Sequence, residues 1–131
     1  MEKKVIILTG ASSGIGFQTA EKLAKQGHIV YVAARSVEKM EPLKAFGVRP
    51  LKLDVTSEAS IDEAVGVVVK EEGRVDVLIN NAGYGSYGAV EDVSIEEARK
   101  QFDVNLFGVA LLTKNRHEKQ PKVCASNIAA T

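Results

Sequence analysis

A glycine-rich segment near the N-terminus has the spacing of a phosphate-binding turn. Beginning at Thr9 it reads Thr-Gly-Ala-Ser-Ser-Gly-Ile-Gly, between an apolar run and a stretch with helical spacing. Free backbone N–H groups and the positive end of a helix dipole can hold a pyrophosphate at such a place. We expect Gly10 to permit the tight turn, Gly14 to let the phosphate approach, and Gly16 to allow close helix packing. The alternative is a purely structural turn, because glycine also suits any abrupt reversal.

The end of the second apolar run indicates which dinucleotide would fit. Residues 33–36 read Ala-Ala-Arg-Ser, with one arginine and no acid. An acid here would bind the ribose 2′-hydroxyl of NAD, whereas an arginine accommodates the 2′-phosphate of NADP. Guanidinium also matches phosphate oxygens in a bidentate way. Arg35 therefore predicts NADP(H) over NAD(H), the alternative being a solvated arginine.

These residues can form one site only if the fold brings them to the same edge of a sheet. Apolar, β-branched runs predict five strands at about 5–8, 29–33, 48–55, 75–79 and 123–125. Helical spacing with end signals predicts helices at about 15–24, 37–46, 58–72 and 95–114. This alternation predicts an α/β fold with a Rossmann-type, doubly wound parallel sheet in the order 3-2-1-4-5, although a flavodoxin-like order alternates in the same way. Pro50 lacks a backbone N–H, so the third strand is expected at the sheet edge.

Length and composition indicate one globular domain. The 131 residues are 45% hydrophobic and 26% charged, and 17 basic residues balance 17 acidic ones. A net charge of zero gives no reason to expect a nucleic-acid or membrane partner. Cys124 is the only cysteine, which suits a reducing compartment and a buried thiol, with no metal-ligand spacing. The N-terminal apolar run is too short for a signal segment, so the cytoplasm is the expected location.

Three motifs in this order resemble the short-chain dehydrogenase/reductase family. They are Thr9–Gly16, Asn80-Asn81-Ala82-Gly83, and Asp103-Val104-Asn105, within a resemblance that covers residues 3 to about 113. Residues 80–85 are most like the retinol and 17β-hydroxysteroid dehydrogenase-like branch. The resemblance implies a dinucleotide cofactor and hydride transfer between its nicotinamide and a small lipophilic alcohol or carbonyl substrate.

The resemblance also implies which residues contact the cofactor. Around the pyrophosphate and its rim these are Gly10, Ser12, Ser13, Gly14, Ile15 and Gly16. Asp54 and Val55 would meet the adenine, and Asn81, Ala82 and Gly83 would border the ribose and nicotinamide. Two structural alternatives stay open. Asp54 could serve only to satisfy a turn, because aspartate commonly accepts hydrogen bonds from nearby backbone there, and the Asn80–Asn81 pair also ties neighbouring strands together.

The set of catalytic residues that the resemblance implies is incomplete in residues 1–131. The family uses a serine, a tyrosine with a lysine four residues later, and a helix asparagine, which Asn105 matches. Ser126 matches the serine after a one-residue shift, whereas an ungapped reading places Asn127 there. No Tyr-x-x-x-Lys occurs in the 131 residues. We expect the cofactor-binding half of an NADP(H)-dependent oxidoreductase, inactive by itself; the alternative is a dinucleotide-binding or sensing module without chemistry.

The C-terminal part departs from the family. Residues 114–122 are almost wholly polar, and we expect Lys114, Arg116, Glu118 and Lys119 to form a solvated, frayed helix end. In the family this helix commonly packs against a partner subunit, so the usual homo-oligomer is in doubt. We also expect the domain, residues 1–131, to be incomplete, with its sheet ending before the last strands.

Overall fold

The sheet has five parallel strands in the order β3-β2-β1-β4-β5, which confirms the predicted order. The computed structural model describes residues 2–11, 14–81, 83, 89–119 and 126–129. The strands are β1 Val5–Thr9, β2 Ile29–Ala34, β3 Arg49–Lys52, β4 Val77–Asn80 and β5 Ser126–Ala129. Because all neighbouring pairs are parallel, the carboxyl ends of the strands meet at one edge of the sheet.

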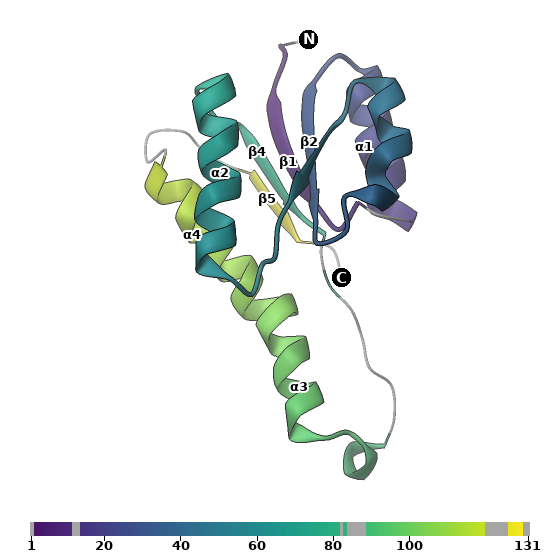
Figure 1. Ribbon diagram of the computed structural model, residues 1–131, viewed down its shortest axis with the longest axis vertical. Helices are drawn as coiled ribbons and strands as arrows, with labels where there is room; N and C mark the ends of the chain where they lie inside the picture. Colours follow the sequence, from purple (N-terminus) through teal and green to yellow (C-terminus); the bar gives the residue numbers. More distant parts are fainter. Residues whose placement is uncertain (1, 12–13, 82, 84–88, 120–125, 130–131) are drawn as a thin grey trace.

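Helices cover both faces of the sheet and connect its strands. They are α1 Gly14–Lys25, the 3₁₀ helix η1 Glu38–Phe46, α2 Glu58–Glu72, the short η2 Val90–Asp92, α3 Ile95–Phe102, the π-helical η3 Asp103–Gly108, and α4 Val109–Lys119. Figure 1 shows α1 on one side of the sheet and α2 with α4 on the other, while α3 extends beyond the carboxyl edge. None of the described helices is long and apolar enough to cross a membrane.

Two apolar cores, one on each face, hold the layers together. Every residue of β1 is buried, as the uninterrupted apolar run predicts for a strand covered on both sides. One core packs α2 and Leu112 of α4 against the sheet, and the other packs α1 and η1 against the opposite face. The two cores fix the sheet between its helices, so the loops at the carboxyl edge start from rigid positions.

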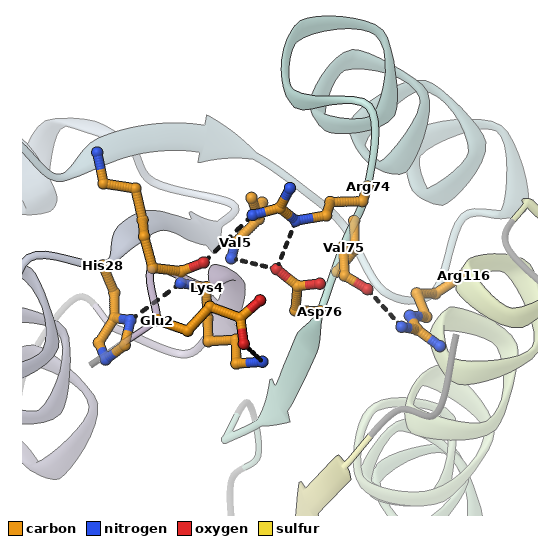
Figure 2. A network of polar contacts seen from close by, with 9 residues as sticks. Glu2, Lys4, Val5, His28, Arg74, Val75, Asp76 and Arg116 are labelled. Atoms are coloured by element: carbon orange, nitrogen blue, oxygen red, sulfur yellow. Dashed lines mark hydrogen bonds and ion pairs between the residues drawn. The ribbon is translucent and has the colours of Figure 1, made fainter. Parts of the chain in front are cut away.

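Polar contacts at the amino edge join β1 to β4 (Figure 2). The Asp76 carboxylate accepts a hydrogen bond of 2.8 Å from the Val5 N–H and pairs at 2.9 Å with the Arg74 guanidinium. The Asp76 N–H in turn donates to the Val5 carbonyl at 2.9 Å. These contacts set where the two central strands begin to pair.

The structure corrects three details of the sequence prediction. The segment predicted as a helix at 37–46 is the 3₁₀ helix Glu38–Phe46, because Pro42 inside it has no N–H to donate and its ring crowds the preceding turn. The fifth strand is Ser126–Ala129, while the predicted 123–125 lies outside the described residues. Arg116 is buried, with 1% of its surface exposed, and donates a hydrogen bond to the Val75 carbonyl, so the prediction of a frayed, solvated helix end was wrong there.

Pro50 lies in β3, which pairs only with β2 among the described strands and so forms an edge, as predicted.

Candidate functional site

A cavity of about 510 Å³ opens at the carboxyl edge of the sheet. Its walls come from the ends of β1 and β2, the segments that follow β2 and β3, the loop after β4, and the π turn η3. Five of the residues singled out in the sequence line it: Gly10, Arg35, Asp54, Val55 and Gly83. The fold thus brings together residues that are far apart in the chain.

The glycine turn begins directly at the end of β1. Gly10 has a φ of +71°, and its N–H donates to the Ala33 carbonyl at 3.1 Å. At Gly16 a Cβ would lie 2.5 Å from Asn81 Nδ2 and 2.5 Å from the Gly10 carbonyl oxygen. Real Cβ atoms essentially never approach so closely, so the absence of a side chain at Gly16 lets α1 start tightly against the turn. Gly14 is exposed, has a φ of +62°, and has no atom within 4 Å of a built Cβ.

Asn81 ties the loop after β4 to the glycine turn. Its Nδ2 donates to the Gly10 carbonyl at 3.1 Å, and its N–H donates to Thr9 Oγ1 at 3.0 Å. Asn80 is buried and donates through Nδ2 to Thr113 Oγ1 of α4 at 3.3 Å. Asn81 therefore has the strand-tying role that the sequence left as an alternative, whereas the Asn80 side chain ties β4 to α4. A contact between Asn81 and a ribose stays a prediction.

The turn after β3 is held by its own hydrogen bonds. Asp54 Oδ1 accepts from the Thr56 hydroxyl at 2.6 Å and from the Thr56 N–H at 3.0 Å. These two bonds, with a smaller contribution from nearby Arg35, hold the pKa of Asp54 below its ordinary value despite partial burial. The Asp54 N–H donates to Ser60 Oγ at 2.9 Å. The structural role of Asp54 is thus present, and its contact with adenine stays a prediction.

Two basic side chains line the part of the cavity next to the end of β2. Arg35 and Lys39 both line the cavity and are exposed, together with Ser36. Neither cation is in an ion pair with a described carboxylate. Sequence reasoning did not identify Lys39, which lies at the start of η1, four residues after Arg35 in the chain. The pair suits an anionic group in the cavity.

The π turn η3 brings the family asparagine to the same edge. Asn105 Oδ1 lies 3.0 Å from the position of a Cβ built on Gly83, so its amide packs against the Gly83 backbone. The neighbouring Val104 lines the cavity. The sequence predicted a continuous helix through Asn105, whereas the structure has a π-helical segment there.

The backbone of Ser126 starts β5 at the amino edge of the sheet, and its assignment to the catalytic set stays a prediction. Ser126 is the first residue of β5 and pairs with Val77, the first residue of β4, at the opposite end of the strands. Asn127 pairs with Leu78 inside the strand. The predicted residues Ser12, Ser13 and Ala82, and also Cys124, lie outside the described residues. No group of three potential metal ligands occurs in the part of the chain that is described.

Comparison with known proteins gives one consistent family. The family model described as short chain dehydrogenase matches residues 4–121. The chain is 46% identical over 115 residues to 3-ketodihydrosphingosine reductase of Bacteroides thetaiotaomicron, which covers 87% of this chain and 41% of that protein. It thus spans less than half the length of this curated relative.

Two solved structures have the same fold at a similar level of identity. A variant of actinorhodin polyketide ketoreductase with NADPH is 34% identical, with a TM-score of 0.87 over 98% of this chain and 53% of the other. The 3-ketoacyl-(acyl-carrier-protein) reductase of Brucella melitensis complexed with NADH is 32% identical. Its TM-score is 0.86 over 98% of this chain and 58% of the other. Sequence motifs, strand order and these likenesses agree, and the chain belongs to the short-chain dehydrogenase family.

Proposed function

We propose that residues 1–131 form one NADP(H)-binding domain of an oxidoreductase that acts on an alcohol or carbonyl compound. The observation that carries this proposal is the cavity at the carboxyl edge, where the glycine turn, Arg35 and the Asp54–Val55 turn meet. Parallel α/β sheets commonly bind ligands at this edge. When bound, the nicotinamide would supply or accept the hydride, and the protein would bind and orient it.

The residues present fit a dinucleotide. Gly14 is the exposed first residue of α1, where a pyrophosphate can approach backbone N–H groups. Gly16 and Asn81 keep this turn against the loop after β4. Val55 and Val104 supply apolar surface in the same cavity, which suits an adenine ring.

NADP(H) is preferred over NAD(H) in this proposal. The two similar structures were solved with NADPH and with NADH, so the family alone does not decide between them. The side chains at the end of β2 favour NADP(H). Arg35 and Lys39 lie where β2 ends, with no acid at that end to bind a ribose hydroxyl, and they match the charge of a 2′-phosphate.

The substrate class that we propose is a ketone carried on an acyl or other extended chain, or the matching alcohol. The three similar proteins act, by their names, on 3-ketodihydrosphingosine, on a polyketide and on 3-ketoacyl groups. This agrees with the lipophilic carbonyl compound expected from the sequence. The likeness to the retinol and 17β-hydroxysteroid dehydrogenase branch stays a prediction.

Calorimetric titration of the 131-residue chain with NADPH and with NADH tests the cofactor proposal. We expect NADPH to bind roughly ten to a hundred times more tightly, because a charge-assisted hydrogen bond contributes about 1.5–3 kcal/mol. The variants Arg35→Gln and Lys39→Gln should each reduce this preference while leaving NADH binding nearly unchanged. Lys44→Gln is the matched control, since Lys44 is also in η1 but pairs with Glu41. Equal affinity for both nucleotides in the wild type would contradict the preference, and no binding of either would contradict the function.

A further inference from the structure

Gly108 ends the π turn that crosses the carboxyl edge beside the cavity. The turn spans Asp103–Gly108, between α3 and α4, and contributes Val104 to the cavity wall. π turns are rare inside helices and are frequent at functional sites.

Gly108 packs directly against the turn after β3. A Cβ built on Gly108 would lie 2.7 Å from Val55 Cγ2, 2.9 Å from Val55 Cβ and 3.0 Å from the Asp103 carbonyl oxygen. Gly108 is buried, and its φ is not positive, so any residue can adopt its backbone conformation. It is the close approach to Val55, and not the backbone conformation, that requires glycine here.

Val55 has little freedom to yield to an added methyl group. The preceding Asp54 is bonded through its carboxylate to Thr56 and through its N–H to Ser60 in the first turn of α2. Val55 also packs against the core that lies between α2 and the sheet. Since Val55 lines the cavity as well, a shift of its side chain changes the cavity wall.

We propose that Gly108 is a positioning residue for the cofactor. Its missing side chain lets the π turn approach Val55, and this contact sets the part of the cavity wall that receives the adenine half. The inference rests on the proposed binding of NADP(H) and adds a residue that touches neither the cofactor nor the reacting atoms.

The test is Gly108→Ala, titrated calorimetrically with 2′,5′-ADP, which contains the adenine half and the 2′-phosphate alone. At a temperature where circular dichroism shows both proteins folded, we expect roughly tenfold weaker binding than in the wild type. Gly66→Ala is the matched control, because Gly66 is also helical and has no atom within 4 Å of a built Cβ. It should bind 2′,5′-ADP as the wild type does. Unchanged affinity in Gly108→Ala would overturn the proposal.

A second pair of variants separates a shifted cavity wall from general destabilisation. Val55→Gly removes both Val55 atoms that would meet the new methyl group. In that background, adding Gly108→Ala should change 2′,5′-ADP affinity by less than about twofold, because the two changes are coupled through one contact. If Gly108→Ala alone does not fold, the comparison of Val55→Gly with the double variant still tests the proposal. If the double variant fails to fold or to bind while Val55→Gly binds, the methyl group acts elsewhere and the proposal is overturned.

Different results would overturn the proposed function and the role of Gly108. A wild-type chain that binds neither NADPH nor 2′,5′-ADP would overturn the proposed function and this inference with it. Normal wild-type binding with an unaffected Gly108→Ala variant would overturn the role of Gly108 alone.

Discussion

At the scale of single residues, glycines serve the site for two different physical reasons. Gly14 has a positive φ and open space around its Cα, so its backbone conformation is what favours glycine. Gly16 and Gly108 have no positive φ, and each leaves too little room for a Cβ. A pattern of glycines in a sequence does not separate these cases, whereas their surroundings in the fold do.

Gly16→Ala should destabilise the protein at the glycine turn. The added methyl group would meet Asn81 Nδ2 and the Gly10 carbonyl, whose hydrogen bond joins two loops. Overpacking of this kind costs about 1–3 kcal/mol of unfolding free energy. Urea denaturation measures the change, and Gly66→Ala serves as the control, with an expected gain of about 0.5–1 kcal/mol in an uncrowded helix. A Gly16→Ala variant as stable as the wild type would disprove the tight packing.

At the scale of elements, Asp76 controls how β1 and β4 begin (Figure 2). Burial acts to raise the pKa of Asp76, but the hydrogen bond from the Val5 N–H and the ion pair with Arg74 outweigh it, so the pKa is lowered. A carboxylate with a lowered pKa in the folded state stabilises the fold while it is ionised. The pairing of the two central strands is thereby linked to pH.

Asp76→Asn should weaken both the stability and its acid dependence. The unfolded-state pKa of an aspartate is about 3.9, so the contribution of Asp76 is complete above about pH 4 and is lost as the pH falls through the lower folded-state value. At neutral pH we expect a loss of about 1–2 kcal/mol, because a hydrogen bond to a charged acceptor becomes a neutral one. Denaturation curves recorded between neutral and acidic pH measure this loss of unfolding free energy. Parallel pH profiles for the variant and the wild type would contradict this account.

At the scale of the whole molecule, the proposed cofactor cavity is accompanied by only some of the residues that the family resemblance implies for catalysis. Asn105 lies at the carboxyl edge, Ser126 lies at the opposite end of the strands, and the 131 residues contain no Tyr-x-x-x-Lys. In the family, that tyrosine exchanges the proton with the substrate oxygen.

The 131-residue chain should therefore bind NADPH without oxidising it in the presence of ketones. The reason is that the 131 residues contain no Tyr-x-x-x-Lys pair, which in the family supplies the proton to the substrate oxygen. The measurement is the absorbance of NADPH at a saturating ketone concentration. It is compared with calorimetric binding of NADPH by the same sample. Sustained, enzyme-dependent loss of NADPH would show that another residue supplies the proton.

The sequence by itself determined the features that depend on neighbours in the chain. An uninterrupted apolar run predicted the buried β1, and alternating strands and helices predicted a doubly wound parallel sheet, whose order they did not separate from a flavodoxin-like one. Arg35, directly after β2, and the glycine spacing predicted two parts of the cavity. Burial periodicity and turn chemistry are local properties, so they can be read without knowing what packs against them.

Only the tertiary structure decided the features that depend on residues far apart in the chain. The contact of Gly108 with Val55 and the burial of Arg116 against Val75 join separate elements. The place of Ser126 follows from the register of β5 on β4, and a shift of a few residues along a strand moves a side chain from one edge of the sheet to the other. Such contacts arise from packing between elements, for which a single sequence holds no local signal.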